Sequence, residues 1–219
     1  MNMVVGMILL LLLLVIAGPG NLPRFISGIF PQFYEGIPCA WLRTAEDRGN
    51  HQSLIGRSAV DPISLRVVTS ALPTDPAGSL IIQIIVTNNS LGTVPIIYNP
   101  DSVVVGDSGA NGLGLIFTPP NGLTAGAPVT TGQTVAEANI RLLGPRQRCI
   151  HTEEFPAGNV LVDPSLTSGS AQVRAFYRNN TRGQVVQAQG AVATPVYNDQ
   201  GLWTGFVESD NVVIRLATQ

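Results

Sequence analysis

The chain contains no lysine, and all twelve of its basic residues are arginine. Charged residues make up only 12% of the 219 positions, about half of the roughly 25% that soluble proteins usually carry. A phosphate-binding glycine loop that requires a lysine is therefore excluded. The formal net charge is −2 and no basic stripe is present, which excludes a nucleic-acid-binding protein because such a protein must neutralise phosphates. The absence of lysine indicates a GC-rich genome and suggests a bacterial source.

Ligands for a metal or a cofactor are also scarce. The sequence has two cysteines, Cys39 and Cys149, and two histidines, His51 and His151. The paired C-x2-C spacing of structural zinc, the C-x-x-C-H motif of c-type haem and the four cysteines of an iron–sulfur cluster are all missing. All three methionines lie in the first seven residues, which disfavours a blue-copper site with an axial methionine. We therefore expect no cofactor, and a metal site built from these four residues is a minor alternative.

No constellation of catalytic side chains is evident in the sequence. A G-x-S-x-G motif is missing, and no nucleophile or acid–base pair stands out. We therefore expect a protein that is not an enzyme. Arg141, Arg146 and Arg148 lie close in sequence to Glu153 and Glu154. This pattern fits an anionic-ligand patch or, as we prefer, a solvated or salt-bridged strand edge.

One long apolar run stands at the start of the chain. The fifteen residues Met3–Ala17 carry no charge and include six consecutive leucines. A helix rises about 1.5 Å per residue, so roughly 20 residues cross a hydrocarbon core about 30 Å thick. We predict a single transmembrane anchor at residues 1–20, ended by the Gly-Pro-Gly of residues 18–20. A cleaved signal peptide is the alternative, because Val15 and Ala17 fit the small-residue pattern before a cleavage site, although no arginine precedes the run.

The next segment, residues 21–60, is rich in proline, glycine and aromatic residues and shows no sustained periodicity. Aromatic rings favour the lipid headgroup zone, where an apolar body and a polar tip are both satisfied, and arginine can reach lipid phosphate there. We predict a juxtamembrane segment whose membrane-interface residues are Arg24, Phe25, Phe30, Phe33, Tyr34 and Trp41. The alternative is that these rings pack on the folded domain or on a partner subunit.

Residues 61–219 show short apolar runs separated by Gly, Asn and Pro turns, which indicates about ten strands. The runs are rich in Val and Ile, which suit a half-buried pleated surface. Helical periodicity is absent here, and so is strand–helix–strand alternation. We predict an all-β, antiparallel, Ig-like β-sandwich on a single N-terminal transmembrane helix. The expected strands are 64–70, 80–86, 94–98, 102–105, 113–118, 134–143, 148–151, 171–177, 184–189 and 211–216.

The two cysteines predict one disulfide, Cys39–Cys149, if the domain lies outside the cytoplasm. It would close a loop of about 110 residues and stabilise the fold by roughly 4–5 kcal/mol in the chain-entropy model. It would also hold the juxtamembrane segment against the sandwich. Two free, buried cysteines are the alternative.

Two observations bear on where the domain lies. Arg24 follows the predicted span and nothing basic precedes it, so the positive-inside rule leans towards a cytoplasmic domain. The cysteine pair and the Thr-, Asn- and Gly-rich sandwich are more typical of an exported domain. We expect a single-pass protein of a bacterial cell membrane with its globular domain on the periplasmic or extracellular side.

A surface this poor in charge is typical of a subunit that partners cover. One N-terminal span, a cofactor-free extracytoplasmic sandwich and arginine in place of lysine resemble the accessory subunits of bacterial respiratory and photosynthetic assemblies. The small subunit of alternative complex III from filamentous phototrophs is the example. The resemblance is one of architecture and transfers no functional residue. It implies a partner role in quinol-to-acceptor electron transfer, with every cofactor on other subunits.

We therefore expect a non-catalytic, membrane-anchored accessory subunit. Its partners would be the lipid bilayer and other integral and extracytoplasmic subunits of a membrane complex. The alternative is a free-standing, membrane-tethered cell-surface or periplasmic module that binds a peptide, a glycan or an envelope polymer.

Overall fold

The chain divides into two compact units, Met1–Gly36 and Ile37–Gln219. The computed structural model describes residues 6–7, 36–44, 61–101, 103–106, 109–125, 134–180, 184–186 and 202–216. The predicted anchor therefore lies outside the described residues except for Gly6 and Met7. The interface residues Arg24, Phe25, Phe30, Phe33 and Tyr34 also lie outside them. Within the described part of the chain, no helix is both long and apolar enough to cross a bilayer.

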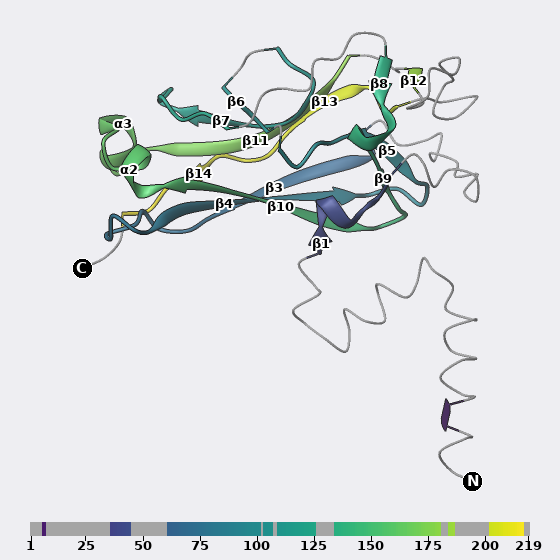
Figure 1. Cartoon of the computed structure of the whole chain (residues 1–219), viewed down its shortest axis with the longest axis horizontal. Helices are drawn as coiled ribbons and strands as arrows, with labels where there is room; N and C mark the ends of the chain where they lie inside the picture. The colour runs from purple at the N-terminus through teal and green to yellow at the C-terminus, as the bar shows by residue number, and fades with distance from the viewer. Residues whose placement is uncertain are drawn as a thin grey trace. The chain divides into compact units, whose positions relative to one another are not determined.

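The second unit consists mainly of β-strands, and its two largest sheets lie one above the other (Figure 1). The first sheet has the strand order β1-β10-β4-β3, with bounds β1 Ile37–Pro38, β3 Ile63–Thr69, β4 Ser79–Asn88 and β10 Arg148–Pro156. The second has the order β13-β11-β7-β6, and β14 also pairs with β11. Its bounds are β6 Val104–Val105, β7 Gly112–Thr118, β11 Gln172–Asn179, β13 Gly205–Glu208 and β14 Val212–Val213.

Two smaller sheets and four short helical turns complete the described structure. The sheets have the orders β2-β9-β5 and β12-β8, with bounds β2 Arg43–Thr44, β5 Val94–Ile97, β8 Thr134–Ala136, β9 Ile140–Leu143 and β12 Gln184–Val186. The 3-10 turns are η2 Cys39–Trp41 and η4 Glu137–Asn139, and the helices are α2 Ala157–Val160 and α3 Pro164–Thr167. Asp163 caps α3 by accepting a 2.9 Å hydrogen bond from the backbone N–H of Ser165, and Pro164 occupies the first helical position.

The all-β prediction is confirmed, and most strands lie on the expected runs. The expected strand 134–143 is divided by η4 into β8 and β9. Residues 37–44, which we placed within the irregular segment, contain β1, η2 and β2. The long ladders are antiparallel, but β1–β10, β6–β7 and β8–β12 are short parallel pairs. A local sequence pattern does not specify which strands pair or in which direction, so it could not reveal these parallel pairs.

Strict alternation of side chains builds the core between the two large sheets. On β4, Leu80, Ile82, Ile84 and Val86 are buried at every second position. On β11, Val173, Ala175 and Tyr177 point to the same core. One contiguous cluster contains both sets, and each large side chain that it buries stabilises the fold by about 1.5–3 kcal/mol.

Tyr177 is the one polar side chain among the largest fully buried residues, and its hydroxyl has a partner. The oxygen accepts a 3.0 Å hydrogen bond from the backbone N–H of Ile97 in β5. Burial raises the pKa of Tyr177 well above its ordinary value. The ring also packs against Trp203 at a centroid distance of 5.4 Å. Tyr177 therefore joins the second large sheet to β5 and to the segment before β13.

The second sheet also buries Phe176 on its outer face, and a glycine makes this possible. Phe176 is fully buried although it alternates with the core residues of β11. It is cross-strand to Gly114 of β7. A Cβ atom at Gly114 would overlap the ring of Phe176 and would lie 2.7 Å from the carbonyl oxygen of Val104. Position 114 therefore requires glycine, because the ring of Phe176 and the backbone of Val104 lie too close for a Cβ atom.

Replacement of this glycine tests that packing. We expect Gly114→Ala to destabilise the domain by about 1–3 kcal/mol, because backbone as well as a ring must move. Gly158→Ala is the matched control, since its new methyl group meets nothing within 4 Å in α2, and it should be neutral or stabilising by up to about 1 kcal/mol. The measurement is the urea midpoint of both variants, and equal midpoints would contradict the packing of Phe176 on Gly114.

Candidate functional site

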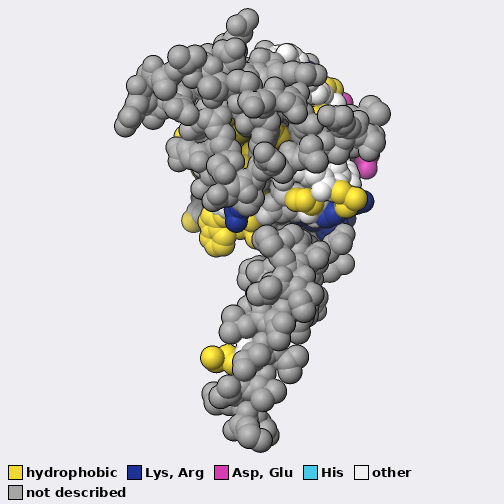
Figure 2. All heavy atoms as spheres, turned by 90° about the vertical axis from the view of Figure 1, so that its right-hand side faces the viewer, with side chains coloured by type: hydrophobic (Ala, Val, Ile, Leu, Met, Phe, Trp, Pro, Cys, Tyr) yellow, Lys and Arg dark blue, Asp and Glu magenta, His cyan; other side chains and the backbone are white. Residues whose placement is uncertain are grey.

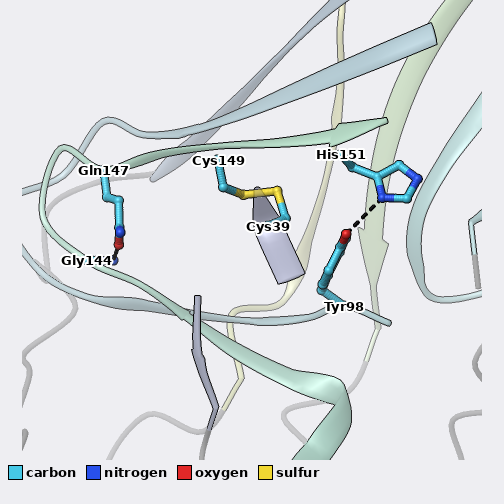
Figure 3. The surroundings of a disulfide bond; sticks show 6 residues. All are labelled: Cys39, Tyr98, Gly144, Gln147, Cys149 and His151. Carbon is cyan, nitrogen blue, oxygen red and sulfur yellow. Dashed lines mark hydrogen bonds between the residues drawn. A yellow bond between two sulfur atoms is a disulfide. The ribbon is translucent and has the colours of Figure 1, made fainter. Parts of the chain in front are cut away.

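The first described segment of the second unit is bonded covalently to the start of β10. Cys39 and Cys149 form a disulfide with a Cα–Cα distance of 4.7 Å, and both residues are completely buried (Figure 3). β1 lies parallel to β10, with Ile37 opposite Cys149 and Pro38 opposite Ile150. The predicted disulfide is therefore confirmed. Its sequence separation of 110 corresponds to roughly 4–5 kcal/mol of chain entropy.

Two turns lie at the same end of the domain as the disulfide. The turn 89–93 joins β4 to β5, and the turn 144–147 joins β9 to β10. The N–H of Asn88 donates to the carbonyl oxygen of Gln147 at 2.9 Å, and the N–H of Arg146 donates to that of Ser90 at 3.2 Å. We call residues 36–43, 89–93 and 144–149 together the disulfide end.

Asn88 holds these turns together. Its side-chain amide donates to the carbonyl oxygens of Gly92, Leu143 and Gly144 at 2.7, 3.0 and 2.8 Å. Its Oδ1 accepts from the backbone N–H and from the hydroxyl of Ser90 at 2.8 and 2.7 Å. We interpreted this residue only as part of a turn. The alternation of β4 was the available signal, because it places position 88 on the buried face.

A chain of three polar side chains continues inward from the disulfide. The hydroxyl of Tyr98 lies 2.8 Å from Nδ1 of His151 (Figure 3). Nε2 of His151 lies 3.0 Å from Oε2 of Glu153. A carboxylate only accepts hydrogen bonds, so Nε2 carries the proton, and Nδ1 of a neutral ring accepts from Tyr98. Cys149 and His151 share the inward face of β10. This network satisfies every polar atom of the buried histidine.

The protonation state of Tyr98 excludes it as a base at neutral pH. Burial raises the pKa of Tyr98 to about 12, and the charges of Asp101 and Glu153 also raise it, whereas that of Arg141 lowers it. The phenol therefore keeps its proton and donates to His151. The arrangement is suited to fixing β5 against β10 and does not form an activated nucleophile.

The metal alternative loses two of its four ligands. A disulfide removes the thiolates of Cys39 and Cys149 that a metal would require. His51 lies outside the described residues. Within the ranges that the structure describes, no group of three or more His, Cys, Asp or Glu side chains could hold a metal ion.

The structure separates the arginine cluster that the sequence brings together. Arg141 is buried, and its guanidinium donates to the carbonyl oxygen of Ala138. Arg146 and Arg148 are exposed at the disulfide end. Glu153 bonds to His151. These residues therefore do not form one anionic-ligand patch.

Trp41 is the one predicted membrane-interface residue that the structure describes, and it is 74% exposed. It occupies η2 between the buried residues Cys39 and Leu42, and the N–H of Leu42 donates to the carbonyl oxygen of Cys39.

Comparison of the chain with protein-family models, curated proteins and solved structures found no match. Evidence on function therefore comes from the sequence and from this end of the domain.

The Asn88 contacts predict that a single substitution at this position strongly destabilises the domain. We expect Asn88→Ala to cost about 2–4 kcal/mol, because it removes several hydrogen bonds and leaves buried carbonyl groups without donors. Asn89→Ala is the control, since Asn89 is exposed and makes one 3.4 Å contact with Ser64, and it should change stability by less than about 0.5 kcal/mol. Urea denaturation checks both, and similar midpoints would argue against the role of Asn88.

The raised pKa of Tyr98 predicts that the stability of the domain depends on pH in the alkaline range. The folded chain holds the phenol proton more tightly than the unfolded chain, so this contribution is complete below the unfolded pKa of 10.0 and is lost as the pH rises towards about 12. Tyr98→Phe should be less stable at neutral pH, and its deficit should shrink across this range. Thermal melts against pH measure the difference, and tyrosinate absorbance should show one late-titrating group fewer. A deficit that does not change with pH would contradict the assignment.

Proposed function

We propose that this chain is a non-catalytic, membrane-anchored accessory subunit of a bacterial membrane complex, with the β domain on the periplasmic side. The observation that carries the proposal is the order of the parts. An uncharged run, Met3–Ala17, precedes a domain whose first described segment is joined to the start of β10 by the Cys39–Cys149 disulfide. A structural disulfide persists in an oxidising compartment, which supports a location outside the cytoplasm.

The surface of the domain supports a role in assembly. Large apolar side chains are exposed on both sheets, with Val68 and Ile81 on the first and Phe206 and Val213 on the second. Neighbouring subunits would cover such positions, because interface cores are depleted of charge and enriched in apolar residues. The two facing sheets and their shared core also support the finer proposal of an Ig-like sandwich.

Electron transport is the process that the architectural resemblance implies. In this proposal the cofactors lie on other subunits, and the present chain holds an extracytoplasmic partner over the membrane. The Tyr98–His151–Glu153 network and the disulfide then serve to fix the orientation of β1, through which the anchor would be attached.

A free-standing binding module is the second candidate, and one surface favours it. Arg178 lies over the ring of Phe206 at 4.8 Å and over that of Phe176 at 5.7 Å. Arg174 and Glu208 form a 3.0 Å ion pair on the same face of β11 and β13. A stacked arginine beside an exposed aromatic ring suits a peptide or glycan ligand.

The anchor is tested by washing membranes. We expect the full chain to stay in the pellet after an alkaline carbonate wash, whereas Leu10→Arg with Leu13→Arg should be released. Two arginines at the centre of a span cost about 5–7 kcal/mol on insertion scales. Val162→Arg, at an exposed site in the β domain, is the control and should stay in the pellet.

Native electrophoresis in mild detergent separates the two candidates. The accessory subunit should co-migrate with other membrane proteins, and a chain that runs alone would favour the binding module. Recovery of a mature chain that starts at Gly18 in the wash fraction would contradict both forms of the membrane proposal and would favour the signal peptide.

A further inference from the structure

Two apolar side chains at the disulfide end are almost fully exposed. Trp41 is 74% and Leu91 is 77% exposed. Trp41 projects from η2, whose neighbours Cys39 and Leu42 already fill the core. Leu91 projects from the turn that Asn88 and Ser90 hold. Both side chains are therefore presented on a backbone that is fixed before any partner arrives, so binding would cost little ordering of the chain.

The charges at this end are mainly basic. Arg43, Arg146 and Arg148 are exposed there, and the acidic residue among the described positions is Asp61, whose neighbour Pro62 accepts a 2.7 Å hydrogen bond from the N–H of Asn89. Figure 2 views the β domain from this side and shows hydrophobic and arginine side chains next to one another on its lower part.

The opposite end of the domain provides a contrast. It is formed by α2, α3 and the turn before β4, since the N–H of Ala157 donates to the carbonyl oxygen of Gly78 at 2.9 Å. Val162 is 76% exposed there, as much as Leu91. The described charged residues near it are Asp75, Glu154, Asp163 and Arg215. Both ends of the domain thus expose a large apolar side chain. The described charges are mainly basic at the disulfide end and mainly acidic at the other end.

We propose that the disulfide end rests on an anionic lipid bilayer, with Trp41 and Leu91 in the headgroup layer and Arg146 and Arg148 beside lipid phosphates. Tryptophan prefers this layer, and guanidinium groups pair with phosphate in a bidentate manner. The negative surface potential of an anionic leaflet favours binding by about fivefold for each arginine near it. The acidic end cannot dock in the same way.

Chain length explains why such a contact matters. The inference rests on the proposed anchor at Met3–Ala17, after which nineteen residues, 18–36, lead to β1. An extended segment of this length spans up to about 65 Å. The tether alone therefore leaves many orientations open, and contact of the disulfide end with lipid selects one of them.

The test uses the full chain reconstituted in phosphatidylcholine vesicles with and without phosphatidylglycerol. Trp41 fluorescence is obtained as the difference between the wild type and Trp41→Phe, which leaves Trp203 as the common background. We expect Trp41 to be quenched by brominated lipid and shielded from acrylamide only when phosphatidylglycerol is present. Flotation of the vesicles reports the anchor separately.

Matched variants give the expected magnitudes. Leu91→Ser should lower the ratio of shielded to accessible Trp41 about tenfold, whereas Val162→Ser should leave it unchanged. Arg146→Asn, which tolerates the positive φ of 55° at this position, and Arg148→Gln should each lower it about fivefold. Arg66→Gln, on the outer face of β3, is the charge control and should have no effect.

The outcomes distinguish the lipid-docking inference from the anchor proposal. Vesicles that float with Trp41 accessible to acrylamide overturn lipid docking and leave the anchor intact. Shielding that is equal in neutral and anionic vesicles overturns docking on an anionic surface. Shielding that persists in detergent shows that the chain itself covers Trp41, and shielding only in native membranes shows a protein partner, so each of these also overturns lipid docking. Loss of flotation overturns the anchor, and the docking inference falls with it.

Discussion

The Cys39–Cys149 disulfide is the constraint on which the arrangement of the described domain depends. β1 pairs with β10 over only two residues, and such a short parallel pair cannot hold a chain segment by itself. The covalent bond removes that weakness and leaves both sulfur atoms buried beside the inward face of β10. Once Cys39 is fixed, Leu42 fills the core and the turn between them must direct Trp41 outward.

Around this bond, the buried side chains of Asn88 and His151 both have hydrogen-bond partners. Asn88 satisfies carbonyl groups of two turns, and His151 is held between Tyr98 and Glu153. A buried polar group without a partner costs about 1–3 kcal/mol, so a partly formed network would weaken the fold. Because the contacts of Asn88 with Leu143 and Gly144 and of Tyr98 with His151 join segments that are distant in sequence, the network also selects one register for β4, β5, β9 and β10.

The exposed residues make the two ends of the domain chemically different. Arginines gather with Trp41 and Leu91 at the end where β1 enters, and carboxylates gather with Val162 at the other. A chain with few charges can still have a strongly asymmetric charge distribution when those charges are segregated. The lipid-docking inference follows from this segregation, since the domain presents chemically different ends to its surroundings.

Some of this was determined by the sequence alone. The Val- and Ile-rich apolar run Leu80–Val86 predicted a strand, and a pair of cysteines in an exported chain predicted their bond. The sequence did not reveal β1, β2 or β13, because each of them contains at most two apolar residues, too few to form a recognisable apolar run. Nor could it decide whether Trp41 packs inward, or that Asn88 binds Leu143, fifty-five positions away. Only the tertiary structure decided these, because burial and hydrogen bonding depend on which distant segments meet, whereas local pattern depends on neighbours along the chain.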